Sequence, residues 1–311
     1  DVNTVNAVID KLKNIPLNTI VSSEYLQSFL EPGGSTLFSQ ISVTERPDVF
    51  VSKLYEGRVG IIVDGTPFAL VLPCLFAENF VTMDDYSHKS YFSAFLRTIR
   101  FFAFIAAAVL PGLYVALCNF HPEMFRTGLL LNIYSSVQTT AYPVFGECLI
   151  MYILYEIMRE AGLRLPRSVG HAVSIVGGLV IGEISVSAGL MSAPVVLIIA
   201  ATGLCSFAVP DLYDSCMILR LVFIVAGGVL GLFGITVCGT VIFFRICEKN
   251  AYGVPYTAPF APVTIKSIMR DTFFRASWKR LSGSDMTVQQ LSGKAKSKRG
   301  GERTIRDEQD K

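Results

Sequence analysis

The sequence predicts a polytopic α-helical membrane protein, with about four spans plus one partial or broken segment, preceded by an N-terminal soluble α+β domain. The first observation is composition: of 311 residues, 51% are hydrophobic and 17% are charged, and the mean hydropathy is +0.49. The second is charge placement, since only 14 of the 150 residues from 98 to 247 are Asp, Glu, Lys or Arg. A soluble domain of this length is usually less apolar, so a membrane protein is predicted.

Changes in composition along the chain predict four parts. Residues 1–95 form the soluble α+β domain and 96–249 the transmembrane helical domain. Residues 250–281 form a juxtamembrane segment, which is basic and aromatic and therefore suited to membrane lipids. Residues 282–311 are polar with mixed charge, so disorder is expected there.

Composition and motifs also exclude several function classes. The net charge of +2 does not indicate a nucleic-acid partner. The seven cysteines are widely spaced, without a CxxC pair or nearby His, so reduced packing cysteines are predicted and no metal site. No hydrolase, metalloprotease, phosphate-loop or dinucleotide motif stands in a suitable context, so no enzyme and no cofactor is predicted.

The soluble domain is predicted to contain short helices and one hairpin. Apolar residues at helical spacing indicate helices near 5–12 and 24–30, and Pro47 begins a third helix that Gly57 ends. Two β-rich runs, 59–63 and 68–72, indicate a hairpin with a four-residue connection.

The first and last spans are the longest apolar runs. After an amphipathic approach at 90–100, residues 99–118 are long enough to cross a hydrocarbon core of about 30 Å. Pro111-Gly112 is predicted to interrupt this span and to kink it. Residues 221–244 are predicted as the last, uninterrupted span. The charges that flank the segments favour an even number of crossings.

Between them, the apolar segments are less regular. Residues 121–160 contain a polar middle and Pro143, so a broken or re-entrant segment, buried in protein or facing water, is predicted. Residues 172–187 and 193–209 predict a tight helical hairpin with a turn of five residues, Ala-Gly-Leu-Met-Ser.

Four polar residues in these segments are candidates for an ion path. An isolated carboxylate inside a membrane is costly and is a functional-site candidate by default, which applies to Glu183. Glu147 is a candidate for a second acidic ring with Glu156 and Glu160, which follow it at spacings of nine and four. Ser185 and Ser187 are suitable neighbours for a cation path. A hydrogen bond across a helix interface is the alternative interpretation of Glu183.

Other polar and small residues are better explained by packing and pairing. Glu156 and Glu160 are expected to pair with nearby arginines at a membrane boundary, and Arg220 to snorkel or pair with Asp214. His171 is expected to be structural. Glycines at helical spacing allow close helix packing, and the candidates are Gly178, Gly182, Gly227 and Gly231.

Several long motifs resemble one family. These are TERPD at 44–48, LYEGRVGIIVDGTPF at 54–68, DDY at 84–86, REAGLRLPRSVGHAVSIVGGLVIG at 159–182 and YGVPYTAPFAP at 252–262. Together, over about residues 20–280, they resemble the A subunit family of spore germinant receptors, the GerA-type proteins of endospore-forming bacteria. The residues that carry the motifs are Glu56, Gly57, Arg58, Asp64, Gly65, Pro67, Arg164, Pro166 and Arg167.

The resemblance implies a subunit of the spore inner membrane with cytoplasmic soluble regions at both ends. It implies a permease-like B subunit that binds the nutrient, a lipoprotein C subunit, and homo-oligomers of the A subunit that conduct ions. Family members carry more N-terminal sequence, so the soluble domain is expected to be truncated here. Two positions depart from the family pattern: Glu183 replaces an uncharged Gln, and Ala141-Tyr142-Pro143 replaces a Val-Pro-Phe-Pro run while keeping the proline.

Three functional hypotheses follow. The first is a nutrient-responsive receptor subunit that forms a gated path for monovalent cations. The second is a secondary transporter, which needs a substrate pocket between broken helices. The third is a non-conducting scaffold of the germination complex. The same motifs also resemble a paralogue in this family that is encoded with the sporulation-stage dipicolinate channel proteins, and the sequence does not separate the two.

Overall fold

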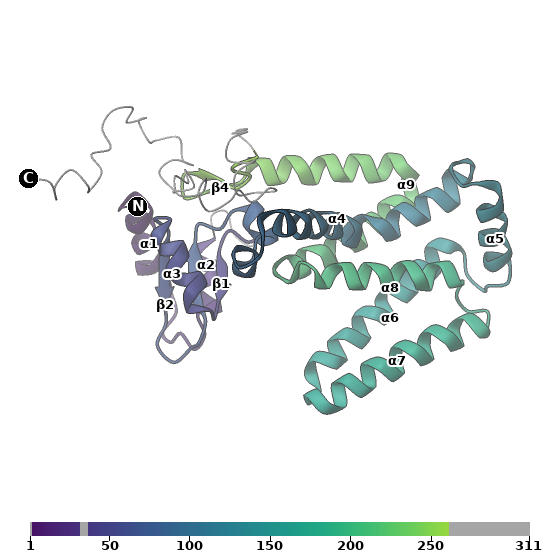
Figure 1. Cartoon of the computed structure of the whole chain (residues 1–311), viewed down its shortest axis with the longest axis horizontal. Helices are drawn as coiled ribbons and strands as arrows, with labels where there is room; N and C mark the ends of the chain where they lie inside the picture. The colour runs from purple at the N-terminus through teal and green to yellow at the C-terminus, as the bar shows by residue number, and fades with distance from the viewer. Residues whose placement is uncertain (1, 32–36, 261–311) are drawn as a thin grey trace, which may run out of the picture. The chain divides into compact units, whose positions relative to one another are not determined.

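A computed structural model describes residues 2–31 and 37–260 (Figure 1). They form two compact units, the first from 2–78 with 248–260 and the second from 79–247. The predicted tail, and the predicted juxtamembrane segment beyond residue 260, lie outside the described residues.

The first unit contains three α-helices and a small antiparallel sheet. Its helices are α1 (Val2–Lys13), α2 (Glu24–Leu30) and α3 (Pro47–Tyr55). Its strands are β1 (Ser42–Thr44), β2 (Val59–Ile62) and β3 (Ala69–Leu72), in the order β1-β3-β2. The coarse prediction of an N-terminal α+β region is therefore confirmed.

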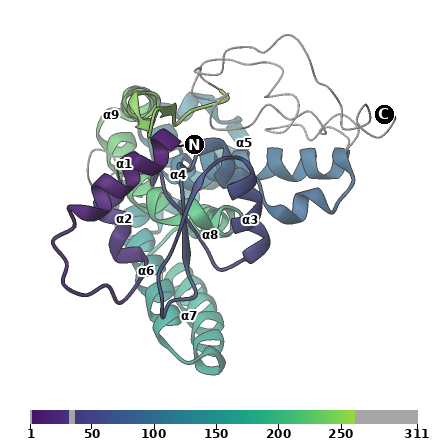
Figure 2. The ribbon, with the colours of Figure 1, turned by 90° about the vertical axis from the view of Figure 1, so that its left-hand side faces the viewer.

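Alternation along the strands gives the sheet two covered faces. Leu70 and Leu72 of β3 point into a core that also contains Val8 of α1 and Leu26 of α2. Gly60 of β2 lies on the opposite face, where α3 packs so closely that an added Cβ would lie 2.4 Å from the Phe50 ring. Helices α1 and α2 thus cover one face and α3 the other (Figure 2).

The predicted hairpin is confirmed, but each strand is one residue shorter than predicted, so the connection has six residues, 63–68, and not four. Val59 pairs with Leu72 and Ile62 with Ala69 in an antiparallel register. Gly65 adopts a φ of 85° in the connection, a conformation that glycine tolerates best. Strand β1 was not predicted, because three residues are too few to show an alternating pattern.

The chain returns to the first unit after the last helix. A short hairpin, β4 (Asn250–Ala251) and β5 (Val254–Pro255), follows there. Lys249 donates from Nζ to the Phe38 carbonyl at 2.6 Å, and the Tyr252 hydroxyl donates to the Leu30 carbonyl. Burial lowers the pKa of Lys249 to about 8. These contacts attach residues 249–256 to the rest of the first unit.

The second unit is helical. Its α-helices are α4 (Ser90–Phe120), α5 (Thr127–Gln138), α6 (Val144–Arg164), α7 (Arg167–Ser187), α8 (Ala193–Phe207) and α9 (Tyr213–Glu248). Short 3-10 turns connect or precede them: η2 (Met83–Tyr86), η3 (Pro122–Met124) and η4 (Pro210–Leu212), while η1 (Phe76–Phe80) spans the boundary of the two units. The predicted turn between α7 and α8 is confirmed at 188–192.

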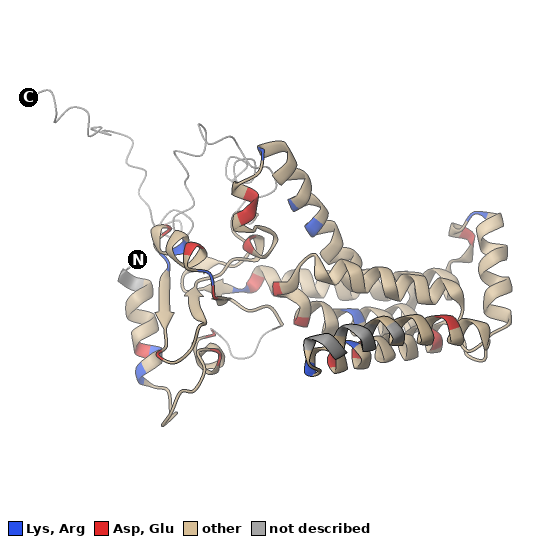
Figure 3. Cartoon of the chain, turned by 60° about the horizontal axis from the view of Figure 1, so that its bottom comes forward, with Lys and Arg blue, Asp and Glu red and all other residues tan. Residues whose placement is uncertain are grey.

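Two described helical stretches are long and apolar enough to cross a membrane, Ser90–Phe120 and Pro210–Glu248. Gly177–Ser187 and Ala193–Phe207 are shorter apolar helices. Among the described residues, charged residues are sparse along the helices of this unit (Figure 3). The number of four crossings stays a prediction.

Two helices differ from the prediction in continuity. Helix α4 runs through Pro111, which lies inside it. Helix α9 was predicted to be uninterrupted, but Gly231 has a φ of 63° and a ψ of −146°, which breaks the helix. A Cβ at this position would lie 2.9 Å from the Phe120 ring, so glycine suits both the conformation and the packing.

Candidate functional site

Glu147 lies in a fully buried contact between two interruptions of the helical unit. Its Oε2 atom accepts hydrogen bonds from the Ser192 backbone N–H at 3.0 Å and from the Ser192 hydroxyl at 2.5 Å. Its Oε1 atom accepts a hydrogen bond from the Thr140 hydroxyl. Ser192 is the N-cap residue of α8, so the Glu147 carboxylate lies at the N-terminus of that helix, where a negative charge is favourable.

Backbone contacts bring the same two segments together. The Ala141 N–H donates to the Gly189 carbonyl at 3.2 Å. Gly189 has a φ of 65°, and a Cβ there would lie 2.8 Å from the Thr139 carbonyl oxygen. Pro143 is the N-cap residue of α6, and its carbonyl accepts the Glu147 N–H at 3.0 Å. The α5–α6 interruption, residues 139–143, and the α7–α8 turn, residues 188–192, are therefore in direct contact.

The other predicted path residues lie at the end of α7 that enters this turn. Glu183 and Ser187 are exposed and Ser185 is half-buried. The Ser185 carbonyl accepts the N–H groups of Leu190 and Met191 at 2.9 and 3.0 Å. Within the described part of the chain, Glu183 has no ion-pair partner, whereas Glu147 is enclosed. The structure thus places the two carboxylates near one turn in opposite environments.

Arg220 is buried at the centre of the helical unit. Its guanidinium donates to the Ala107 carbonyl of α4 at 2.8 Å and to the Ser206 hydroxyl of α8 at 2.5 Å. It also pairs with Glu156 of α6 at 3.4 Å. The predictions that Arg220 snorkels or pairs with Asp214 were wrong, because the side chain points inward and connects α9 with three other helices.

Glu156 extends this network toward the end of α6. Its Oε2 atom accepts hydrogen bonds from Arg159 and from the Tyr213 hydroxyl, both at 2.9 Å. The predicted pairing of Glu156 with Arg159 is confirmed. Glu160 pairs with Arg164 at 2.8 Å on the exposed side, as predicted.

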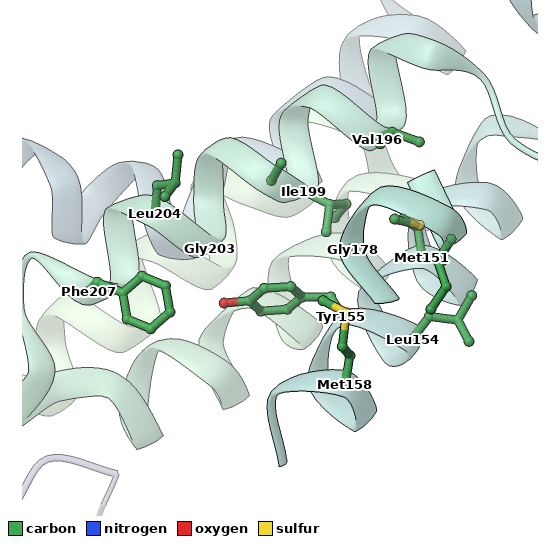
Figure 4. A pocket seen from close by; sticks show the side chains of 12 residues that line it. Met151, Leu154, Tyr155, Met158, Gly178, Val196, Ile199, Gly203, Leu204 and Phe207 are labelled. Atoms are coloured by element: carbon green, nitrogen blue, oxygen red, sulfur yellow. The ribbon is translucent and has the colours of Figure 1, made fainter. Parts of the chain in front are cut away.

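Residues of α6, α7 and α8 line a pocket of about 280 Å³ that is partly open (Figure 4). Its lining is almost entirely apolar and includes Met151 and Met158 of α6 and Phe207 of α8. Tyr155 and Gly203 meet in its wall, where an added Cβ on Gly203 would lie 2.8 Å from the tyrosine ring. A polar substrate would find few hydrogen-bonding groups in this pocket.

The four predicted packing glycines have different surroundings. Gly227 lies in a close approach of α9 to α4, where a Cβ would be 2.3 Å from the Gly112 carbonyl oxygen. Gly231 marks the interruption of α9. Gly178 and Gly182 leave room for a Cβ, whose nearest neighbours would lie 4.0 and 3.7 Å away.

In the first unit, the motif residue Arg58 forms a buried ion-pair cluster. Its guanidinium donates to both carboxylate oxygens of Glu78 and to the Pro73 carbonyl, while Lys53 approaches Glu78 at 3.0 Å. Glu56 pairs with Arg58 at 3.0 Å. Burial alone would raise the pKa of Glu78, but the charges of Arg58 and Lys53 hold it below its ordinary value.

The remaining motif residues occupy turns and helix ends. Gly57 follows α3 with a φ of 84°. Asp64 and Pro67 are exposed in the hairpin connection with Gly65. Pro166 stands immediately before α7, which begins at Arg167. The side chains of Arg167 and His171 lie outside the described side chains.

The Glu78 cluster predicts a specific response to acid. The folded pKa of Glu78 is lowered, so the folded state binds fewer protons than the unfolded state, and this stabilisation is lost as the pH falls below about 4.3 toward the folded value. Glu78→Gln is expected to lower the melting temperature of the protein in detergent at pH 7. As the pH is lowered, the melting temperature of this variant should decrease less than that of the wild type. Glu45→Gln, at an exposed position, is the control and should keep the wild-type profile. Equal profiles for all three proteins would contradict this role of Glu78.

A second buried cluster was missed from the sequence. Asp85, in the DDY motif, accepts hydrogen bonds from Arg97 at 3.2 Å and from Arg100 at 2.7 and 3.0 Å. Burial opposes ionisation, yet hydrogen bonds from Arg100 and the Thr82 N–H hold the pKa of Asp85 below its ordinary value. The sequence does contain a signal for this cluster: the acidic DDY motif is followed by two arginines, Arg97 and Arg100, at helical spacing.

Comparison with known proteins identifies relatives over most of the chain. The family profile described as Bacillus/Clostridium GerA spore germination protein matches residues 1–285. Spore germination protein KA of Bacillus subtilis (strain 168) is 39% identical over 89% of this chain and 51% of its own length. The uncharacterized membrane protein YfkQ of Bacillus subtilis (strain 168) is 34% identical over 94% of this chain and 58% of its own length.

Spore germination protein A1 of the same organism is 33% identical over 85% of this chain and 55% of its own length. The chain thus spans about half the length of the curated relatives it matches. No solved structure matches the chain.

Proposed function

Because this chain belongs to the GerA spore germination protein family, we propose that it is part of the A subunit of a nutrient-responsive germination receptor. In this proposal, copies oligomerise in the spore inner membrane and form a gated path for monovalent cations that triggers germination. A permease-like B subunit and a lipoprotein C subunit are the proposed partners. The family is non-enzymatic. The two long apolar helices, and a relative that is named as a membrane protein, identify this chain as a membrane protein.

The observation that carries the cation path is the environment of Glu183. The carboxylate is exposed on α7, whose neighbouring side chains include the exposed Leu179 and Ile184. Placing a charged carboxylate in contact with lipid hydrocarbon costs roughly 3 kcal/mol of free energy, so such a residue usually faces water or another protein surface. If several copies assemble with this face toward a common centre, each Glu183 carboxylate lies in a water-filled path and attracts cations there. The exposed carboxylate therefore supports both parts of the proposal, the oligomer and the cation path.

The apolar pocket between α6, α7 and α8 does not favour the transporter hypothesis. A carrier for a polar nutrient needs a substrate site near the membrane midplane with several polar groups. The described lining offers mainly methionine, aliphatic and aromatic carbon. This pocket therefore does not support the transporter hypothesis. An ion-flux measurement separates the channel hypothesis from the scaffold hypothesis.

Ion flux tests the proposal directly. The purified protein is reconstituted in liposomes, alone and with its candidate B and C partners, and potassium flux is recorded with a fluorescent indicator. Flux without a counter-substrate is expected, and Glu183→Gln should lower it roughly tenfold because a single ring of carboxylates concentrates cations at a path. Glu160→Gln, which removes a charge from the exposed end of α6, is the matched control.

The other outcomes assign the alternatives. Saturable flux that requires a co-transported substrate would favour the transporter. Absence of flux in every complex would leave the scaffold. Equal flux in wild type and Glu183→Gln would remove Glu183 from the path.

A further inference from the structure

The burial of Glu147 makes it unlike a residue that lines an open path. Its side chain is 0% exposed, and none of the Lys and Arg side chains in the described part of the chain pairs with it. Both oxygens are instead occupied by hydroxyl and N–H donors from Thr140 and Ser192. A buried carboxylate without a counter-charge is costly unless such donors remain in place.

These donors come from two segments that are far apart in the sequence. Thr140 belongs to the α5–α6 interruption, and Ser192 lies 45 residues beyond Glu147, at the start of α8. The backbone bond from Ala141 to Gly189 joins the same segments. One side chain therefore holds the α7–α8 turn against the α5–α6 interruption.

The α7–α8 turn, residues 188–192, directly follows the candidate path residues at the end of α7. Ser185 accepts two backbone hydrogen bonds from the turn, so displacement of residues 188–192 would also displace the end of α7. Glu183 lies in the same last turns of that helix. The position of the candidate path residues therefore depends on the contact that Glu147 makes.

We propose that Glu147 is a positioning residue, a latch that keeps the α7–α8 turn on the α5–α6 interruption while the cation path is closed. When the path opens, the α7–α8 turn is released and water reaches the Glu147 carboxylate. Because water then replaces the lost hydrogen bonds to the carboxylate, the open arrangement is a second stable state. The proposal rests on the proposed cation path, and it assigns Glu147 to closure of the path and not to cation binding in the closed state.

Substitutions distinguish a latch from a path-lining carboxylate. Glu147→Ala removes all three bonds and is expected to raise resting potassium flux in liposomes roughly tenfold, since each bond to a charged acceptor contributes substantially to the closed state. Thr140→Val and Ser192→Ala remove bonds on opposite sides and should raise flux less. Glu147→Gln keeps an acceptor for Ser192 and gains a donor toward Thr140, so it should stay closed. A path-lining role predicts the reverse, with Glu147→Gln losing flux.

The matched control is Ser135→Ala. The Ser135 hydroxyl is exposed, and among the residues that the structure describes it bonds only to the Asn132 carbonyl of its own helix, at 2.9 Å, so flux should not change. Helicity and monodispersity of each variant are recorded in detergent to exclude unfolding.

Hydrogen exchange provides a second readout that does not depend on conduction. Glu147→Ala is expected to speed amide exchange in both 139–147 and 188–195 while leaving 103–116 of α4 unchanged. Unchanged exchange in the two segments would overturn the latch. Faster exchange with unchanged resting flux, in a wild type that conducts, would also overturn it. If no variant conducts, the proposed cation path fails, and exchange alone decides whether Glu147 holds the two segments together.

Discussion

Replacement of Glu156 by Leu is expected to destabilise the helical unit by about 3–5 kcal/mol, the usual cost of removing one partner of a buried ion pair. Arg220 is 0% exposed and would keep its positive charge among carbonyls and a hydroxyl, without its carboxylate. A charge in such surroundings is poorly compensated by neutral acceptors. The measurement is the midpoint of unfolding by SDS in mixed detergent micelles, followed by circular dichroism.

The double variant tests this cause. Arg220→Met with Glu156→Leu removes both charges and replaces them with apolar side chains, so it should recover a substantial part of the lost stability. Glu160→Gln disrupts an ion pair whose side chains are 79% and 48% exposed, and it should change the midpoint little. A double variant less stable than Glu156→Leu would show that hydrogen bonds and packing of Arg220, and not its charge, dominate.

Local structure was largely predictable from the sequence. The hairpin of β2 and β3 follows from two β-rich runs, and α3 follows from a proline in its first turn and a glycine after its end. The turn at 188–192 follows from small residues between two apolar runs. In each case, the signal and the structure lie within the same few residues, where turn chemistry and hydrophobic spacing decide the conformation.

Long-range pairing was not predictable in the same way. Arg220 and Glu156 are 64 residues apart, and Glu147 and Ser192 are 45 apart. Each charged residue was recognised as unusual in an apolar segment, but its partner depends on how the helices pack. The sequence pattern therefore indicated that Glu147 matters and did not indicate that it is enclosed.

Glycine stripes show the same limit. Helical spacing grouped Gly178, Gly182, Gly227 and Gly231 together, yet Gly227 lies at a backbone contact and Gly231 breaks α9. The pattern records where a side chain is absent. Whether the space is filled by a neighbouring backbone, by a side chain or by a change of φ is decided by tertiary packing.

Gly227→Ala is expected to separate α4 and α9 and to lower the stability of the helical unit by about 1–3 kcal/mol or more. The new Cβ would lie 2.3 Å from the Gly112 carbonyl oxygen and 3.3 Å from its Cα, and backbone atoms cannot move aside as a flexible side chain can. The approach is mutual, because a Cβ on Gly112 would lie 2.3 Å from the Phe223 carbonyl oxygen. The midpoint of unfolding by SDS measures the effect.

Gly239→Ala on the same helix is the matched control for Gly227→Ala. A Cβ at Gly239 would meet nothing within 4 Å, so only the helix propensity changes, and alanine is favoured over glycine by about 1 kcal/mol in a helix interior. The two substitutions add the same methyl group to the same helix, and opposite signs are expected. If Gly227→Ala also stabilised the protein, α4 and α9 could not approach each other through their backbones at Gly112 and Gly227.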